Sequence, residues 1–148
     1  MICTRRPCVL YDHSRAIAND SVSPAVIDTA VRLADGLDEE LYVVHLVDED
    51  TADGTAMQLR DEMRERFRDA TIVATVAIEH VGRSAMRSGT RIGNELLELA
   101  ADVDVRHIVM GHEPKGLAGR LREGDAAVAV IDAADVPVTI VPERPSDV

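Results

Sequence analysis

The sequence predicts an α/β fold: a five-stranded, mainly parallel sheet that is doubly wound, with helices on both faces in three layers. Three observations predict this class. Apolar runs alternate with segments whose apolar residues recur every three or four positions, in the order β-α-β-α-β-α-β-α-β. The run from Glu40 to Val47 is apolar almost throughout, as in a strand that is covered on both faces. No internal repeat interrupts the 148 residues, so we expect one domain over residues 1–148, and alternating strands and helices require a mainly parallel sheet.

The first strand is expected at Cys8–Tyr11, and Asp12 then stands at its carboxyl end. A helix follows, because Ser23 can serve as an N-cap and Pro24 suits the first helical turn. The apolar residues of this segment lie on one helical face, and Gly36 is expected to close the helix.

The second strand, Glu40–Val47, contains His45. A histidine inside a buried strand is more often packed and hydrogen-bonded than a ligand, and we interpret His45 in that way. A second helix is expected from Ala56, with opposite charges three or four positions apart on its exposed face: Asp61/Arg64, Glu62/Arg66 and Glu65/Arg68. Thr71–Val81 is rich in β-branched residues and partly alternating, which suits a strand near the sheet edge.

The stretch Gly82–Arg91 is locally basic because it contains Arg83, Arg87 and Arg91. Two interpretations stay open: a loop that holds an anion, and a solvated loop that follows an edge strand. Thr90 is expected to be the N-cap of a third helix.

The fourth strand is expected at His107–Met110 and ends at Gly111, where a glycine-containing loop opens. A helix is expected to begin near Asp125. The last strand, Val136–Pro142, is bracketed by prolines, which suits a sheet edge.

Strand, glycine loop and helix follow one another between residues 106 and 133. In a parallel sheet such a loop lies at the carboxyl end of a strand, and the next helix directs its N–H groups and positive dipole end toward it, which suits a phosphate. The loop is not a Walker A motif, because Gly111 and Gly116 have the required separation but Leu117 stands where that motif has lysine. The dinucleotide-binding pattern GxGxxG is absent as well.

The stretch resembles the signature of the universal stress protein (UspA) family. That signature follows an apolar strand ending in Met-Gly and reads Gly, two residues, Gly, nine residues, Gly, then Ser or Thr. Aligned from Gly111, the second glycine falls on Pro114, the third on Gly124, and the Ser/Thr position holds Asp125. The signature is therefore degenerate at Pro114 and Asp125, although the resemblance extends over nearly the whole chain and includes Asp12 after the first strand.

The resemblance implies a HUP-like fold, of the adenine-nucleotide alpha-hydrolase type, with strand order 3-2-1-4-5. It also implies a nucleotide site at the carboxyl ends of the strands. The residues that would line this site by resemblance are Asp12, Leu46, Met110, Gly111, Pro114, Gly124, Asp125 and Ala126. Members of the family usually pair through the last strand, which implies a homodimer through Val136–Val141.

Two substitutions indicate that triphosphate binding is lost or weak, so no cofactor is expected. Pro114 has no N–H to offer an oxygen, and Asp125 would place a carboxylate where a phosphate oxygen is expected. Aspartate is also a favoured N-cap. The alternative is an ATP- or AMP-binding switch, or a weak ATPase, whose phosphates are held by Lys115, Arg120 and Arg122. A solvated loop is the other interpretation of these three basic residues.

The charge balance narrows the classes of partner. The 27 acidic and 16 basic residues give a net charge of −11, so nucleic-acid binding is not expected. This acidic surplus with a single lysine, Lys115, resembles proteins of salt-loving organisms, and an ordinary arginine-rich acidic protein is the other interpretation. Cys3 and Cys8 lack partners at metal-ligand spacing and are interpreted as ordinary thiols. Without a membrane-spanning apolar run or a signal-like start, we expect a soluble, cytoplasmic protein with no membrane partner.

A catalytic role has little support in the sequence. His13 and His112 are expected at strand ends, and with Asp12 they form a conceivable acid–base cluster. Polar residues at strand ends are expected in this architecture anyway, and no nucleophile elbow, paired-cysteine metal site or HExxH motif accompanies them. We assign no catalytic residue and no metal ligand.

Overall fold

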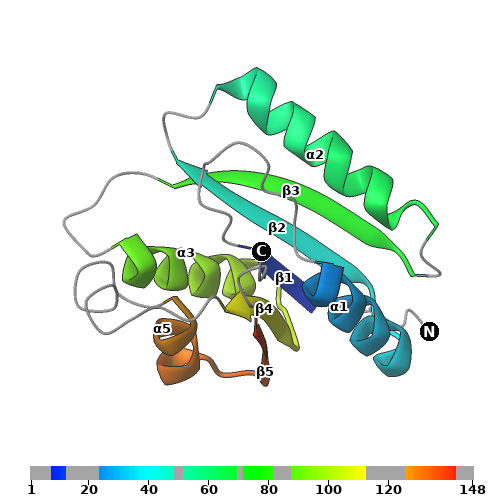
Figure 1. The fold of residues 1–148 in the computed structure, drawn as a ribbon. Coiled ribbons are helices and arrows are strands. Elements are labelled where there is room, and N and C mark those ends of the chain that lie inside the picture. Colours follow the sequence, from blue (N-terminus) through cyan, green and yellow to red (C-terminus); the bar gives the residue numbers. More distant parts are fainter. Residues whose placement is uncertain are drawn as a thin grey trace, which may run out of the picture.

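The computed structural model of the chain describes residues 8–12, 24–48, 52–69, 72–81, 88–112 and 126–142. Within these residues strands and helices alternate along the chain (Figure 1). The strands are β1 (Cys8–Asp12), β2 (Leu41–Asp48), β3 (Ala74–Val81), β4 (Ile108–His112) and β5 (Val138–Pro142). The helices are α1 (Pro24–Leu37), α2 (Asp53–Phe67), α3 (Ser88–Asp102) and α5 (Ala126–Ala133).

The described strands form one five-stranded sheet in the order β3-β2-β1-β4-β5. Every pairing in it is parallel. The chain adds β2 and β3 on one side of β1 and, after α3, places β4 and β5 on the other side. The α/β class with parallel strands, predicted from the alternation of elements, is confirmed. The direction of strand order reverses between β1 and β4, which is where open α/β sheets bind ligands.

The sheet has an apolar cluster on each face. The α1/α2 cluster includes Val26, Ala30, Ala34, Leu41, Val43, Met63, Phe67, Val76, Val109 and Val141. The α3/α5 cluster includes Val44, Leu96, Ala100, Val105, Ile108, Met110, Ala127 and Val130. Figure 1 shows the helices of the two clusters on opposite sides of the sheet. Neighbouring residues Val43 and Val44 of β2 belong to different clusters and are both 0% exposed, as expected for a strand that is apolar throughout.

The end of α1 differs from the prediction. Gly36 does not close the helix, which continues past it until Asp38 adopts a left-handed conformation with φ of 54°. The Asp38 N–H donates to the Asp35 carbonyl at 3.2 Å, and the Glu39 N–H donates to the Ala34 carbonyl at 2.9 Å. These two bonds form a Schellman motif, in which aspartate occupies the position that glycine usually takes. The short polar side chain of aspartate tolerates this conformation better than most side chains do.

The start of α3 differs from the prediction, and its end adds a feature that the sequence analysis did not predict. The helix begins at Ser88, so Thr90 lies in its first turn and the prediction of Thr90 as N-cap is wrong. This stretch contains serine and threonine residues that can each form an N-cap, and their spacing alone does not identify the one at which the helix begins. At the other end Asp104 has φ of 55°, and the Val105 N–H donates to the Ala100 carbonyl at 3.0 Å. The helix therefore ends in the same Schellman geometry as α1.

The two last strands are shifted relative to the prediction. Gly111 does not end the fourth strand, because Gly111 and His112 pair with Val141 and Pro142 of β5 and extend β4 by two residues. The last strand begins at Val138 and not at Val136. β3 and β5 are the two edge strands of the described sheet, which confirms both edge predictions.

Candidate functional site

The neighbouring strands β2, β1 and β4 are parallel, so their carboxyl ends lie side by side at the same end of the sheet (Figure 1). Asp12 is the last residue of β1 and is in register with His45 of β2. On the other side of β1, Tyr11 is in register with Met110, and Gly111 follows Met110 in β4. The structure thus brings the backbone of Asp12 close to the strand ends that the resemblance implies for a nucleotide site.

Leu46 is placed by its backbone. It follows His45 in β2 and is in register with Glu79 of β3. Its position lies one residue beyond the partner of Asp12, on the same edge of the sheet. The sheet topology therefore places the backbone of Leu46 near the carboxyl end of β1, where Asp12 lies.

Met110 lies at the end of β4 with its side chain in the core. Its side chain is 1% exposed and belongs to the α3/α5 cluster together with Val44 and Ile108. A side chain enclosed in this way stabilises the core and offers a ligand only its backbone groups. Gly111, the next residue, is half-buried.

The helix that follows the candidate loop, α5, begins at Ala126. Ala126 packs against the α3/α5 cluster, and Ala127 is a buried member of that cluster together with Met110. The first turn of α5 and strand β4 therefore pack in the same apolar cluster. The N-terminus of a helix carries a positive partial charge. Ala127 and Val128 both have interaction partners in the structure.

Several predicted site residues lie outside the described residues. These are Pro114, Gly124 and Asp125, together with the basic residues Lys115, Arg120 and Arg122 and the histidine His13. Arg83 and Arg87 lie outside them too, whereas Arg91 lies in α3.

Gly93 of α3 makes a close contact with α5 that the sequence-based reasoning missed. A Cβ atom on Gly93 would lie 2.7 Å from the Ala129 Cβ and 3.0 Å from the Ala126 carbonyl oxygen. The backbone of α3 therefore approaches the first turn of α5 more closely than any side chain at position 93 permits. A glycine inside a helical pattern was the available signal, because glycine costs a helix interior about 1 kcal/mol relative to alanine and usually has a packing reason.

One titratable residue of β2, His45, is buried, and another, Tyr42, is half-buried. His45 is 3% exposed, which agrees with its interpretation as a packed residue. Burial of Tyr42, and next to it the negative charge of Glu79, raise the pKa of Tyr42 above its ordinary value. Among the described residues no three His, Cys, Asp or Glu side chains come together as a metal site would require.

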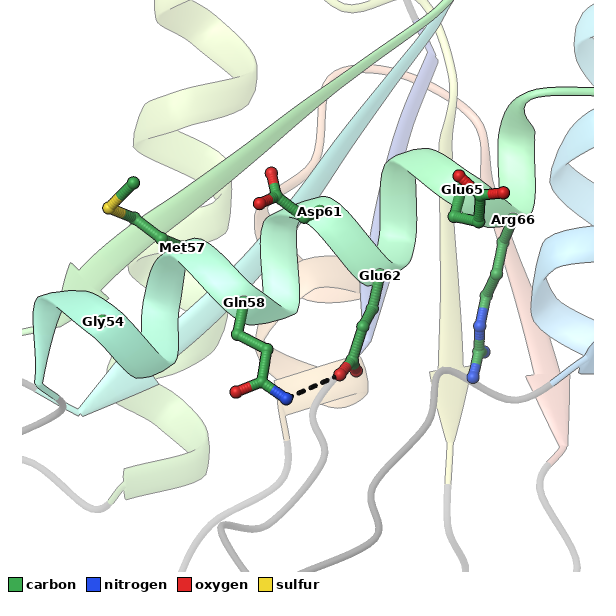
Figure 2. Close-up of a pocket in the computed structure, with 7 residues that line it drawn as sticks. All are labelled: Gly54, Met57, Gln58, Asp61, Glu62, Glu65 and Arg66. Carbon is green, nitrogen blue, oxygen red and sulfur yellow. Dashed lines mark hydrogen bonds between the residues drawn. The ribbon is translucent and has the colours of Figure 1, made fainter.

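The surface of α2 carries a shallow hollow of about 820 Å³. Figure 2 shows the residues that line it, which are Gly54, Met57, Gln58, Asp61, Glu62, Glu65 and Arg66. The Gln58 amide donates to the Glu62 carboxylate at 3.0 Å, and Glu65 pairs with Arg68 at 2.5 Å, which confirms one of the predicted charge pairs. All of these lining residues belong to one helix and none is a predicted site residue. Among the described residues, we therefore interpret the hollow as part of the solvent-exposed face of α2 and not as a ligand site.

No helix among the described residues has the length and apolar character needed to cross a bilayer.

Known proteins that resemble the chain share its architecture. The profile of the universal stress protein family matches residues 15–142. No curated protein matches the chain. A universal stress protein from Archaeoglobus fulgidus has a TM-score of 0.64 at 22% identity, over 91% of this chain and 97% of that one. The Archaeoglobus fulgidus universal stress protein in complex with dAMP has a TM-score of 0.62 at 21% identity, over 91% and 96%. A universal stress protein in complex with cAMP has a TM-score of 0.64 at 18% identity, over 94% and 98%. At these identities the likeness to solved structures concerns the fold alone.

Proposed function

Because the chain belongs to the universal stress protein family, we propose that it is a cytoplasmic, dimeric regulatory module of a stress response that binds nucleoside triphosphates weakly or not at all. The observation that carries this proposal is the start of α5 at Ala126. Asp125 immediately precedes Ala126 in the sequence, and we propose that it is the N-cap of the helix that would face a phosphate group.

A carboxylate at this N-cap competes with a phosphate for the same helix end. Two like charges about 4 Å apart repel by about 1 kcal/mol in water and about 4 kcal/mol at intermediate dielectric. These energies correspond to an affinity loss of about five-fold to about a thousand-fold for each phosphate charge. Pro114 adds to the effect, because it has no N–H and fixes the backbone where the family has glycine.

The N-cap role proposed for Asp125 concerns the first turn of α5. An aspartate N-cap accepts hydrogen bonds from the second and third residues of the helix, which here are Ala127 and Val128. Both residues have interaction partners in the structure. With Asp125 as the N-cap, the N-terminal end of α5 would need no bound anion to satisfy its free N–H groups.

The substitution Asp125→Asn tests the charge separately from the cap, because asparagine caps a helix about as well as aspartate does. We expect Asp125→Asn to bind Mg-ATP at least about ten-fold more tightly than wild type in titration calorimetry. Asp132→Asn is the matched control, since Asp132 is exposed near the other end of α5. Equal affinities of Asp125→Asn, Asp132→Asn and wild type would contradict the proposal.

The second candidate function is an adenine-nucleotide switch or a weak ATPase. The complexes of universal stress proteins with dAMP and cAMP favour it, because both ligands carry a single phosphate group and would meet less repulsion from Asp125 than a triphosphate. Lys115, Arg120 and Arg122 would then hold the phosphate. Parallel titrations with AMP, cAMP and Mg-ATP distinguish the two functions. Micromolar binding of a monophosphate alone indicates a switch, and ATP hydrolysis that is lost in Lys115→Ala indicates an ATPase.

We propose a homodimer that forms through the last strand, Val136–Val141. β5 is an edge strand of the described sheet, and an edge strand can pair with another chain. The neighbouring helix α5 carries two exposed apolar side chains three residues apart, Val128 at 50% and Ile131 at 56% exposure. An apolar surface beside an open sheet edge suits a second copy of the same chain.

A further inference from the structure

We infer that Gly93 is a positioning residue for the candidate nucleotide site, because it allows α3 to hold the first turn of α5 in place. The inference rests on the proposed function, since it concerns the same helix end at which Asp125 and a phosphate group would compete. Gly93 itself touches no ligand in this proposal and acts through α5.

The contact between Gly93 and α5 is closer than side chains allow. Gly93 is buried. A Cβ atom at this position would lie 2.7 Å from the Ala129 Cβ, 3.0 Å from the Ala126 carbonyl oxygen and 3.5 Å from the Ala126 Cα. The 2.7 Å contact is shorter than van der Waals contact allows, and the Ala129 Cβ is bonded directly to the backbone of α5, so a methyl group at position 93 must displace that helix. The displaced part would be the first turn of α5, which begins at Ala126.

Other helical glycines show that this contact is specific. A Cβ atom on Gly36 of α1 or on Gly54 of α2 would meet no atom within 4 Å. At those two positions alanine has room and a better helix propensity than glycine. At Gly93 the close approach to α5 offsets the poor propensity of glycine.

The position of this first turn determines the geometry of the candidate site. Ala127, the second residue of α5, is packed in the α3/α5 cluster with Met110, and Gly111 follows Met110 at the end of β4. Moving the first turn of α5 away from α3 therefore changes its distance from the end of β4. Hydrogen bonds from a helix end to an anion are short and weaken steeply with distance, so a displacement of a few tenths of an ångström matters.

The first test is the amide spectrum of ¹⁵N-labelled protein. We expect Gly93→Ala to shift the amide resonances of Ala126, Ala127 and Val128 more than that of Ala133 at the end of α5. Adding Ala129→Gly removes the nearest clashing atom and should restore most of the wild-type shifts. Gly36→Ala is the matched control and should leave the amides of α5 unchanged. Shifts in Gly93→Ala that are no larger in the first turn than in the last would overturn the inference.

The second test measures Mg-ATP affinity by titration calorimetry in Pro114→Gly/Asp125→Ser, the variant in which the proposed obstacles to a phosphate are removed. We expect Gly93→Ala to weaken binding in this background by about ten-fold, and Ala129→Gly to restore it. Gly36→Ala should have no effect. Unchanged affinity in Gly93→Ala would reduce Gly93 to a packing residue and overturn its positioning role.

The two proposals fail in different ways. If Pro114→Gly/Asp125→Ser gains no affinity, the proposed obstruction by Pro114 and Asp125 fails, and the amide shifts decide the role of Gly93 without a ligand. If wild type binds Mg-ATP tightly, the proposed function fails, and the effect of Gly93→Ala on affinity is then measured in wild type.

Discussion

Tyr42 of β2 is half-buried on the face of the sheet that α3 and α5 cover. It packs against the α3/α5 cluster, and its pKa is raised above 10.0 first by burial and second by the negative charge of Glu79. Both effects disfavour the phenolate. The folded chain therefore holds the phenolic proton more tightly than the unfolded chain does.

Glu79→Gln is expected to lower the pKa of Tyr42 toward 10.0, because it removes the second of the two causes. A raised pKa in the folded state gives a stabilising contribution that is complete below the unfolded pKa of about 10 and is lost as pH rises through the folded pKa. The measurement is phenolate absorbance against pH, with Tyr42→Phe identifying the signal. Glu95→Gln, an exposed change in α3, is the control. An unchanged pKa in Glu79→Gln would show that burial alone accounts for the shift.

Individual residues differ in how far their roles follow from the sequence. The burial of His45 was predictable from its place in an apolar strand. The core position of Met110 was not, because a resemblance assigns a residue to a site without stating where its side chain points. Gly93 was missed because its partner, Ala129, is distant in the sequence and the contact exists only after α3 and α5 pack.

The helices and strands follow from periodicity, but their ends do not. α1 and α3 both end at an aspartate with positive φ, which is Asp38 in α1 and Asp104 in α3. Glycine is the residue that usually marks such an end, so Gly36 was chosen wrongly. Strand β4 extends past Gly111 because pairing with β5 outweighs the local preference of glycine.

Asp104→Gly is expected to raise the free energy of unfolding by about 0.5 kcal/mol, because glycine adopts positive φ without strain while making the unfolded chain more flexible. The measurement is urea denaturation at constant m-value. Ala101→Gly is the control within α3, since Ala101 is exposed and helical. It should lower stability by about 0.5–1 kcal/mol. A loss of stability in both variants would contradict the assigned strain at Asp104.

At the scale of the whole molecule, the alternation of strands and helices was sufficient to predict the α/β class. Alternation alone does not determine that β4 lies next to β1, because after α3 the next strand could extend the sheet beside β3 or beside β1. That choice places Asp12 and Gly111 at one edge and so creates the candidate site. Pro114, Gly124 and Asp125 lie outside the described residues, so their role remains a prediction from the sequence.

The proposed dimer gives a molecular mass in light scattering of twice the chain mass of 16.1 kDa. Val128→Lys/Ile131→Lys is expected to give monomers, because it places charges on the apolar surface of α5 beside β5. Leu37→Lys is the control, since Leu37 is 51% exposed at the end of α1, on the other side of the sheet. A monomeric wild type would contradict the dimer. A double variant Val128→Lys/Ile131→Lys that stays dimeric would contradict the interface.

We propose that the carboxylate of Asp125 occupies the helix end at which the fold would bind a phosphate group. Titration calorimetry with Mg-ATP on wild type and on Pro114→Gly/Asp125→Ser tests it most directly. We predict no micromolar binding by wild type and a clear gain of affinity in the variant. Micromolar binding of Mg-ATP by wild type would contradict the claim.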